Sequence, residues 1–134
     1  MMWEDKMKID IVNITRKENE NYQVTAKIFN DIFSAEWHSG EPFKKSYEVE
    51  MELDEELIWN ENIRASDKGV DSIIQDGECI KIFARLDYNH EDDLAALYIY
   101  NSIILIDLLG ANQDLSAIRI EALCESIKLY DVNL

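Results

Sequence analysis

Residues 46–56 (SYEVEMELDEE) alternate strictly between two kinds of side chain. The apolar side chains occupy every second position, at Tyr47, Val49, Met51 and Leu53. The positions between them are acidic, at Glu48, Glu50 and Glu52. Because successive side chains of an extended chain point to opposite faces, this period of two predicts a β-strand with one buried and one solvated face.

The same alternation, or a run of β-branched residues, marks further segments along the chain. They are residues 7–15, 22–29, 32–38, 70–75 and 78–87. Two pairs of these segments are joined by residues that tolerate the positive φ of a tight turn, Asn30-Asp31 and Asp76-Gly77. The sequence therefore predicts two β-hairpins in addition to the strand at 46–56.

Three segments leave a choice between strand and helix. Residues 94–109 form either one buried helix or two strands that turn at Asn101-Ser102, and their many isoleucines and tyrosines favour strands. Residues 116–130 alternate and then shift phase, but the same side chains also satisfy helical spacing. Residues 54–66 do not alternate, and we expect an irregular crossover in which Asp54 caps a short helical turn.

Together these segments predict a mainly β fold. We expect an antiparallel sandwich or partly closed barrel of about eight to ten short strands, with at most one or two short helices. The length of 134 residues is that of one domain, and 47% hydrophobic residues suffice for one core. No proline-rich linker, low-complexity segment or repeat marks a boundary, so we expect residues 1–134 to form a single domain.

Charge is the strongest signal in the composition. The chain has 28 acidic and 13 basic residues, for a formal net charge of −15. Such a field repels phosphate backbones and anionic membranes and attracts basic proteins. We therefore expect a basic protein partner, and neither direct nucleic-acid binding nor membrane binding. The alternative explanation is that the charge only keeps the protein soluble. The sequence does not indicate an oligomeric state.

The start of the chain and its cysteines bear on location. MMWEDKMKID lacks the basic start and apolar run of a secretory signal, so we expect the mature chain to begin here. No stretch is apolar over the roughly 20 residues of a membrane helix. Cys79 and Cys124 lie far apart without CxxC spacing, which indicates buried free thiols in a reducing compartment. These observations predict a cytoplasmic protein.

The familiar catalytic and cofactor motifs are missing from the sequence: no glycine-rich phosphate loop, HExxH, GxSxG or zinc-ligand spacing. We therefore assign no catalytic residue and no cofactor. His38 and His90 fit ordinary polar side chains better than a general base. Residues 87–93 (DYNHEDD) resemble a calcium loop, but the sixth and twelfth EF-hand positions hold Asp92 and Tyr98. We interpret them as a solvated hairpin turn without metal.

The acidic face of the strand at 46–56 is the candidate binding site. Side chains two apart on a strand lie about 6.6 Å from each other. Glu48, Glu50 and Glu52 therefore form a row of carboxylates that Asp54 continues, and lysines or arginines of a partner can pair with it. The alternative is that these acids form an ordinary solvent face or protect a strand edge against aggregation.

Trp37 and Trp59 flank this acidic row in the sequence. Tryptophan is a frequent anchor in protein interfaces, where charged residues surround it. We therefore include both tryptophans in the candidate partner-binding surface, with burial in the core as the alternative.

The function predicted first is a non-enzymatic protein-binding domain whose carboxylates occupy the sites where a basic partner, such as a nuclease, binds phosphate. In charge and size the chain resembles the small acidic immunity proteins that neutralise bacterial toxins, which implies an inhibitor. The first alternative is a β-barrel that carries a small ligand in an apolar cavity lined by Tyr98, Tyr100 and Phe83. The second is a hydrolase that uses two carboxylates converging in a cleft.

Overall fold

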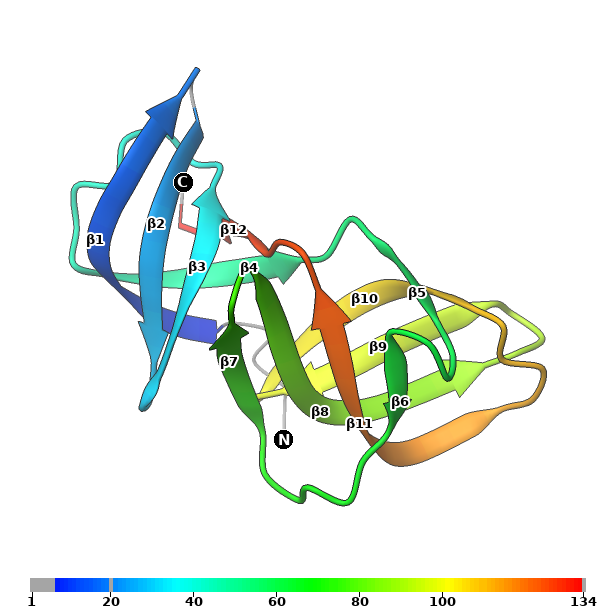
Figure 1. The fold of residues 1–134 in the computed structure, drawn as a ribbon. Coiled ribbons are helices and arrows are strands. Elements are labelled where there is room, and N and C mark those ends of the chain that lie inside the picture. The colour runs from blue at the N-terminus through cyan, green and yellow to red at the C-terminus, as the bar shows by residue number, and fades with distance from the viewer. Residues whose placement is uncertain (1–6, 20, 134) are drawn as a thin grey trace.

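The computed structural model describes residues 7–19 and 21–133. Its regular structure consists of two groups of strands that lie side by side (Figure 1). The first barrel comprises β1 (Met7–Glu18), β2 (Asn21–Ile28), β3 (Asp31–Trp37), β4 (Ser46–Glu52) and β12 (Lys128–Asp131). The second sheet comprises β5 (Glu56–Ile58), β6 (Ile63–Ala65), β7 (Ser72–Asp76), β8 (Cys79–Asn89), β9 (Leu94–Ile99), β10 (Ser102–Leu109) and β11 (Leu115–Cys124). The described residues contain no helix of the length and apolarity that a membrane span requires.

The first barrel is closed by a strand from the far end of the chain. Its strands pair in the order β1-β2-β3-β12-β4, and β4 returns to pair with β1. β12 fills the gap by pairing in parallel with β3 and antiparallel with β4. The chain therefore begins in this barrel, builds the second sheet between β4 and β12, and then comes back to it.

The second sheet is nearly closed around an apolar interior. Its strands follow the order β5-β10-β9-β8-β11-β6, with β7 paired to β8 as an additional strand. A single bridge between Trp59 and Ile63 joins the ends that carry β5 and β6. The interior is filled by alternate side chains of the long strands, including Ile82, Leu86 and Leu97. Together with the buried side chains of the first barrel they form one apolar cluster.

The prediction of a mainly β fold with a partly closed barrel is confirmed. Twelve strands occur in the described residues, more than predicted, because residues 54–66 hold β5 and β6. The helical turn expected there is wrong. Asp54 forms an ion pair with Lys128 and precedes a strand. Residues 94–109 form β9 and β10, and residues 116–130 belong to β11 and β12, so the helical alternatives are also wrong.

The hairpin turns lie one position away from the predicted ones. The β2–β3 turn is Phe29-Asn30, the β7–β8 turn is Gly77-Glu78 and the β9–β10 turn is Tyr100-Asn101. Gly77 has a φ of 62° at the first turn position, which glycine adopts without strain. The hairpins predicted from the turn residues are therefore present, with a register shifted by two residues.

Both cysteines are free thiols, as predicted, but only Cys124 is also buried as predicted. Cys124 is buried in the second sheet, and its thiol donates a hydrogen bond to the carbonyl oxygen of Ile80 at 3.4 Å. Burial raises the pKa of the Cys124 thiol to about 12. Cys79 is partly exposed at the start of β8.

A carboxylate at the tip of the β2–β3 hairpin links the two groups of strands. Oδ2 of Asp31 accepts hydrogen bonds from the hydroxyl of Tyr100 at 2.6 Å, the backbone N–H of Ile73 at 2.9 Å and the hydroxyl of Ser72 at 3.1 Å. The three donors belong to the second sheet and its β9–β10 turn. Burial, followed by the hydrogen bond to Asp31, raises the pKa of the Tyr100 hydroxyl.

We expect Asp31→Ala to lower the free energy of unfolding by about 1–3 kcal/mol, because it removes the acceptor of the Ile73 N–H and the Ser72 hydroxyl and leaves the Tyr100 hydroxyl only the carbonyl oxygen of Asp71, at 2.9 Å. Tyr100→Phe removes one of these bonds and should cost about 1 kcal/mol. Urea unfolding followed by fluorescence measures both values. Asp67→Ala, at an exposed loop position, is the control. If Asp31→Ala lowers the free energy of unfolding no more than the control does, Asp31 does not link the two groups of strands.

Candidate functional site

A groove of about 750 Å³ runs between β4 of the first barrel and β10 of the second sheet. Four carboxylates line it, those of Glu50, Glu52, Asp54 and Asp107. Two apolar side chains of β10, Ile103 and Leu105, face the same hollow. The groove therefore combines acidic walls with an apolar strip, and strands from both groups build it.

The carboxylates of β4 lie where the alternation of residues 46–56 predicts them. Glu50, Glu52 and Asp54 are exposed, whereas the side chains between them point into the core. Glu48 continues the row on the same face but is partly buried. The opposing wall supplies Asp107, which is also exposed. The predicted row therefore forms one side of a two-sided acidic groove.

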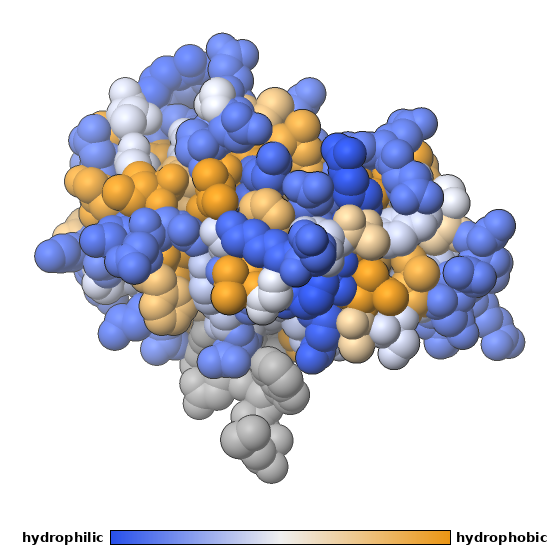
Figure 2. Space-filling model, turned by 60° about the horizontal axis from the view of Figure 1, so that its bottom comes forward, coloured by the Kyte–Doolittle hydropathy of each residue, from blue (hydrophilic) through white to orange (hydrophobic). Residues whose placement is uncertain are grey.

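Leu105 is the most exposed apolar side chain of the groove, at 71%. Its strand alternates between buried positions, such as Ile104 and Ile106, and outward positions, of which Leu105 and Asp107 are two. Apolar patches interrupt a largely hydrophilic surface elsewhere on the molecule as well (Figure 2). The contribution of β10 was missed in the sequence, although the acidic residue at Asp107 marks the outward phase of that strand.

Lys128 of β12 sets the charge balance at one end of the groove. Its ammonium group forms an ion pair with Asp54, and this interaction lowers the pKa of the Asp54 carboxyl. A hydrogen bond with Asp54, together with some burial and the charge of Asp54, raises the pKa of Glu52. Glu52 is therefore the first of the two carboxyls to take up a proton as the pH falls.

The two tryptophans do not line the groove. Trp37 is only 1% exposed and packs against Tyr47 inside the first barrel, with ring centres 4.5 Å apart. Trp37 is therefore in the core, as the alternative given for it predicts, because its position on β3 belongs to the core face. Trp59 is partly buried after β5, where its backbone N–H donates to the carbonyl oxygen of Leu109 at 2.8 Å.

The three side chains proposed to line a ligand cavity do not enclose a common one, although Tyr98 borders an open hollow of about 500 Å³ beside Leu94 and Leu105. Phe83 and Tyr98 occupy the strand positions opposite to the buried Ile82 and Leu97, so they lie on the outer face of the second sheet. Tyr100 lies in the turn next to Asp31. The small-ligand alternative therefore loses the lining on which it depended.

The histidines and the calcium-like turn have local partners. The His38 ring stacks on that of Tyr130 with centres 5.3 Å apart, and Nδ1 of His90 lies 3.3 Å from the Tyr88 hydroxyl. In the turn, the Asp93 carboxylate accepts a hydrogen bond from Tyr88 at 3.2 Å. Within residues 7–19 and 21–133, no three His, Cys, Asp or Glu side chains gather as a metal site would require.

Neither a protein-family model, a curated protein nor a solved structure matches this chain.

The coupling of Glu52, Asp54 and Lys128 gives a prediction about titration. In an NMR titration of side-chain carboxyl carbons, Glu52 should titrate above, and Asp54 below, the same residue types in an unstructured peptide. Lys128→Gln should move the Asp54 midpoint upward, because the ammonium that stabilises the carboxylate is lost. An Asp54 midpoint that Lys128→Gln leaves in place would show that the ion pair has no influence in solution.

Proposed function

We propose that this protein is a non-enzymatic binding domain that captures a basic protein in the groove between β4 and β10, as an inhibitor of a basic toxin or nuclease does. The observation that carries the proposal is the placement of four carboxylates and an exposed leucine around one hollow. The net charge of −15 adds long-range attraction for a partner of opposite sign.

The acidic walls match a segment that carries lysine or arginine side chains. Glu50 and Glu52 are two positions apart on β4, which spaces them by about 6.6 Å along the strand. Asp107 supplies a carboxylate from the opposite wall. A basic segment lying along the groove can pair with both walls. The carboxylates then occupy the positions that the phosphates of a nucleic acid occupy on the basic partner.

The apolar strip adds a contact surface that excludes water, which charge alone does not provide. Exposed ion pairs contribute little because water screens them, whereas a contact that excludes water strengthens the charges at its rim. Leu105 and Ile103 provide such a contact beside the carboxylates. A partner with an apolar side chain next to its basic residues fits this surface better than a uniformly charged polymer.

The carboxylate-hydrolase alternative gains less from the same groove. Glu52 and Asp54 are in contact, but both are exposed. Glycosidase chemistry requires one carboxyl group with a pKa raised by a desolvated setting. The binding role is therefore the function that this geometry favours. The cytoplasmic location stays a prediction from the sequence.

The experiment compares three immobilised proteins as baits for a lysate of the source cells. They are the natural chain, a groove variant (Glu50→Lys, Glu52→Lys, Asp107→Lys) and a control variant with the same change in charge (Glu61→Lys, Glu78→Lys, Glu91→Lys), whose sites are exposed and outside the groove. We expect the natural chain and the control variant to retain a basic protein that salt releases. The groove variant should not retain it.

Retention of the same proteins by the groove variant would overturn the proposal. Surface substitutions of this kind usually change stability by no more than about 0.5 kcal/mol each, so circular dichroism should show all three baits folded. Leu105→Ser should weaken capture without changing its salt dependence, because it removes apolar contact and leaves the charges in place. If the captured protein is an enzyme, its activity should fall when the natural chain is added in excess.

A further inference from the structure

The outer face of the second sheet carries two arginines at directly opposed positions. Arg85 of β8 and Arg119 of β11 are register partners across adjacent antiparallel strands. Their neighbours Ala84 and Ile120 are fully buried on the core face, so both arginines belong to the outer face. Like charges directly opposite each other destabilise a sheet. In a chain with more than twice as many acidic as basic residues, this pairing needs a physical explanation.

Arg119 is held in place by two contacts and has one donor left over. Its Nη1 lies 2.9 Å from Oδ1 of Asp71, and its Nε donates to the carbonyl oxygen of Lys68 at 3.2 Å. Its Nη2 is buried and has no acceptor among the described residues. The side chain as a whole is 28% exposed, and its Nη1 carries a second N–H besides the one directed at Asp71.

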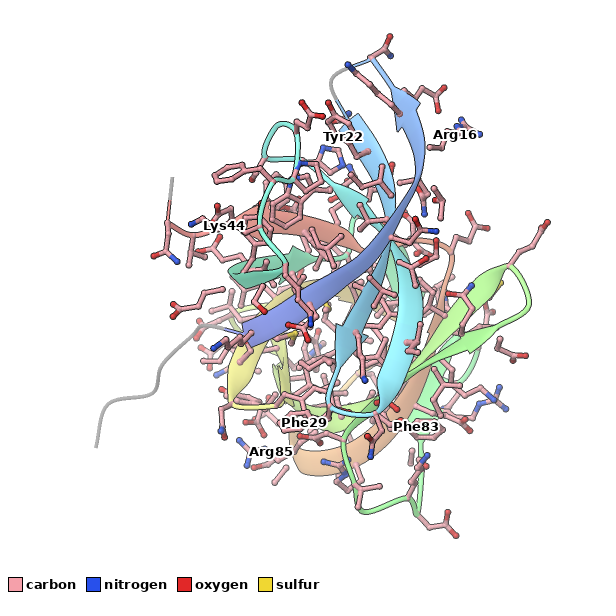
Figure 3. The ribbon with its side chains drawn as sticks, turned by 90° about the vertical axis from the view of Figure 1, so that its left-hand side faces the viewer. Arg16, Tyr22, Phe29, Lys44, Phe83 and Arg85 are labelled. Carbon is pink, nitrogen blue, oxygen red and sulfur yellow. The ribbon has the colours of Figure 1, made fainter. Side chains whose placement is uncertain are left out.

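Arg85 is held by an aromatic ring instead of a carboxylate. Its guanidinium carbon lies 4.4 Å from the centre of the Tyr98 ring. Its Nε is buried without an acceptor among the described residues. Figure 3 labels Arg85 and Phe83 in the lower half of the view, together with Phe29 of the β2–β3 turn. Stacking on Tyr98 fixes the plane of the guanidinium.

The acidic side chains on the same face are already engaged. Asp87 accepts a hydrogen bond from the backbone N–H of Ala117 at 2.6 Å. Glu121 pairs with Arg64 at 3.7 Å and with Lys81 at 3.9 Å. Asp71, as described above, pairs with Arg119. None of these carboxylates makes an ion pair with Arg85 in the described part of the chain.

A third cation borders the pair. The Nζ atom of Lys68 lies 4.1 Å from the centre of the Phe83 ring, and Phe83 is the outward neighbour of Arg85 on β8. Phe83 is 9% exposed, so this part of the face is largely shielded from water. Charges interact more strongly where water is excluded. Lys68 thus places a third cation next to the two arginines, of which Arg119 is paired with Asp71.

We propose that Arg85 and Arg119 form a binding site for an oxyanion, the carboxylate or phosphate group of a ligand, held between the two guanidinium groups. A shared anion removes the repulsion between the arginines and accepts hydrogen bonds from those of their N–H groups that face solvent. Guanidinium groups bind both kinds of oxyanion through paired hydrogen bonds. The site lies outside the acidic groove and does not depend on the function proposed for it.

The experiment follows the arginine side-chain Nε–Hε signals by NMR while sodium phosphate is added, with sodium glutarate as the carboxylate probe and sodium chloride at matched ionic strength as the control. Saturable shifts of the Arg85 and Arg119 signals are the expected result. A response to phosphate alone assigns the site to phosphate ligands, and a response to both probes assigns it to oxyanions in general.

Variants separate this site from a structural role. Arg85→Gln should weaken phosphate binding about tenfold or more, because a charge-assisted contact is lost. Arg64 belongs to the same sheet, is 60% exposed and is paired with Glu121, so Arg64→Gln should leave phosphate binding unchanged. In chloride, Arg85→Gln should keep or raise the melting temperature, since it removes the like-charge pair. If that variant does not fold, Arg85→Lys, which keeps the charge and loses the paired geometry, takes its place in the titration.

Two results would overturn the inference. One is a set of shifts that chloride reproduces at the same ionic strength, which would mean that phosphate and glutarate only screen the charges. The other is a loss of melting temperature in Arg85→Gln or Arg85→Lys together with unchanged phosphate binding, which would make Arg85 a structural residue.

Discussion

The relative placement of the two groups of strands depends on the hydrogen bonds that the Asp31 carboxylate accepts. Asp31 lies at the end of the β2–β3 hairpin, and its Oδ2 accepts hydrogen bonds from donors that belong to the second sheet and its β9–β10 turn. A second link joins β3 to β7, where the backbone N–H of Ser34 donates to the side chain of Gln75 at 2.8 Å. Because the candidate groove takes one wall from β4 and the other from β10, its shape depends on this junction and on the apolar cluster that the two groups share.

The outer face of the second sheet connects the acidic groove to the arginine pair. Ile103 of the groove is the register partner of Tyr98, Tyr98 is that of Arg85, and Arg85 is that of Arg119. With strands about 4.8 Å apart, Arg85 lies about 10 Å from Ile103 along this row. The surface thus presents carboxylates, apolar side chains and guanidinium groups in succession. A partner that places a basic segment in the groove can also bring an anionic group to the arginines.

Alternation in the sequence predicts which face of a strand is buried but not the exact position of a turn, for one physical reason. Moving a two-residue turn by one position changes the hairpin register by two residues, and a shift of two keeps every buried side chain opposite a buried one. In the β2–β3 hairpin, for example, the observed register pairs Tyr22 with Trp37 and Ala26 with Phe33. Alternation therefore cannot distinguish the predicted turn from the observed one, and packing between particular side chains decides.

The sequence by itself determined the β character of the chain and the outward direction of Glu50 and Glu52, because the period of two is a local property of extended backbone. It also contained the outward phase of β10, which the acidic residue at Asp107 marks. Only the tertiary structure decided that β4 lies beside β10, that β12 closes the first barrel, that Trp37 is buried and that Arg85 meets Arg119. These neighbours are distant in the sequence, and their pairing follows from how the whole set of strands shares one core, which no local pattern records.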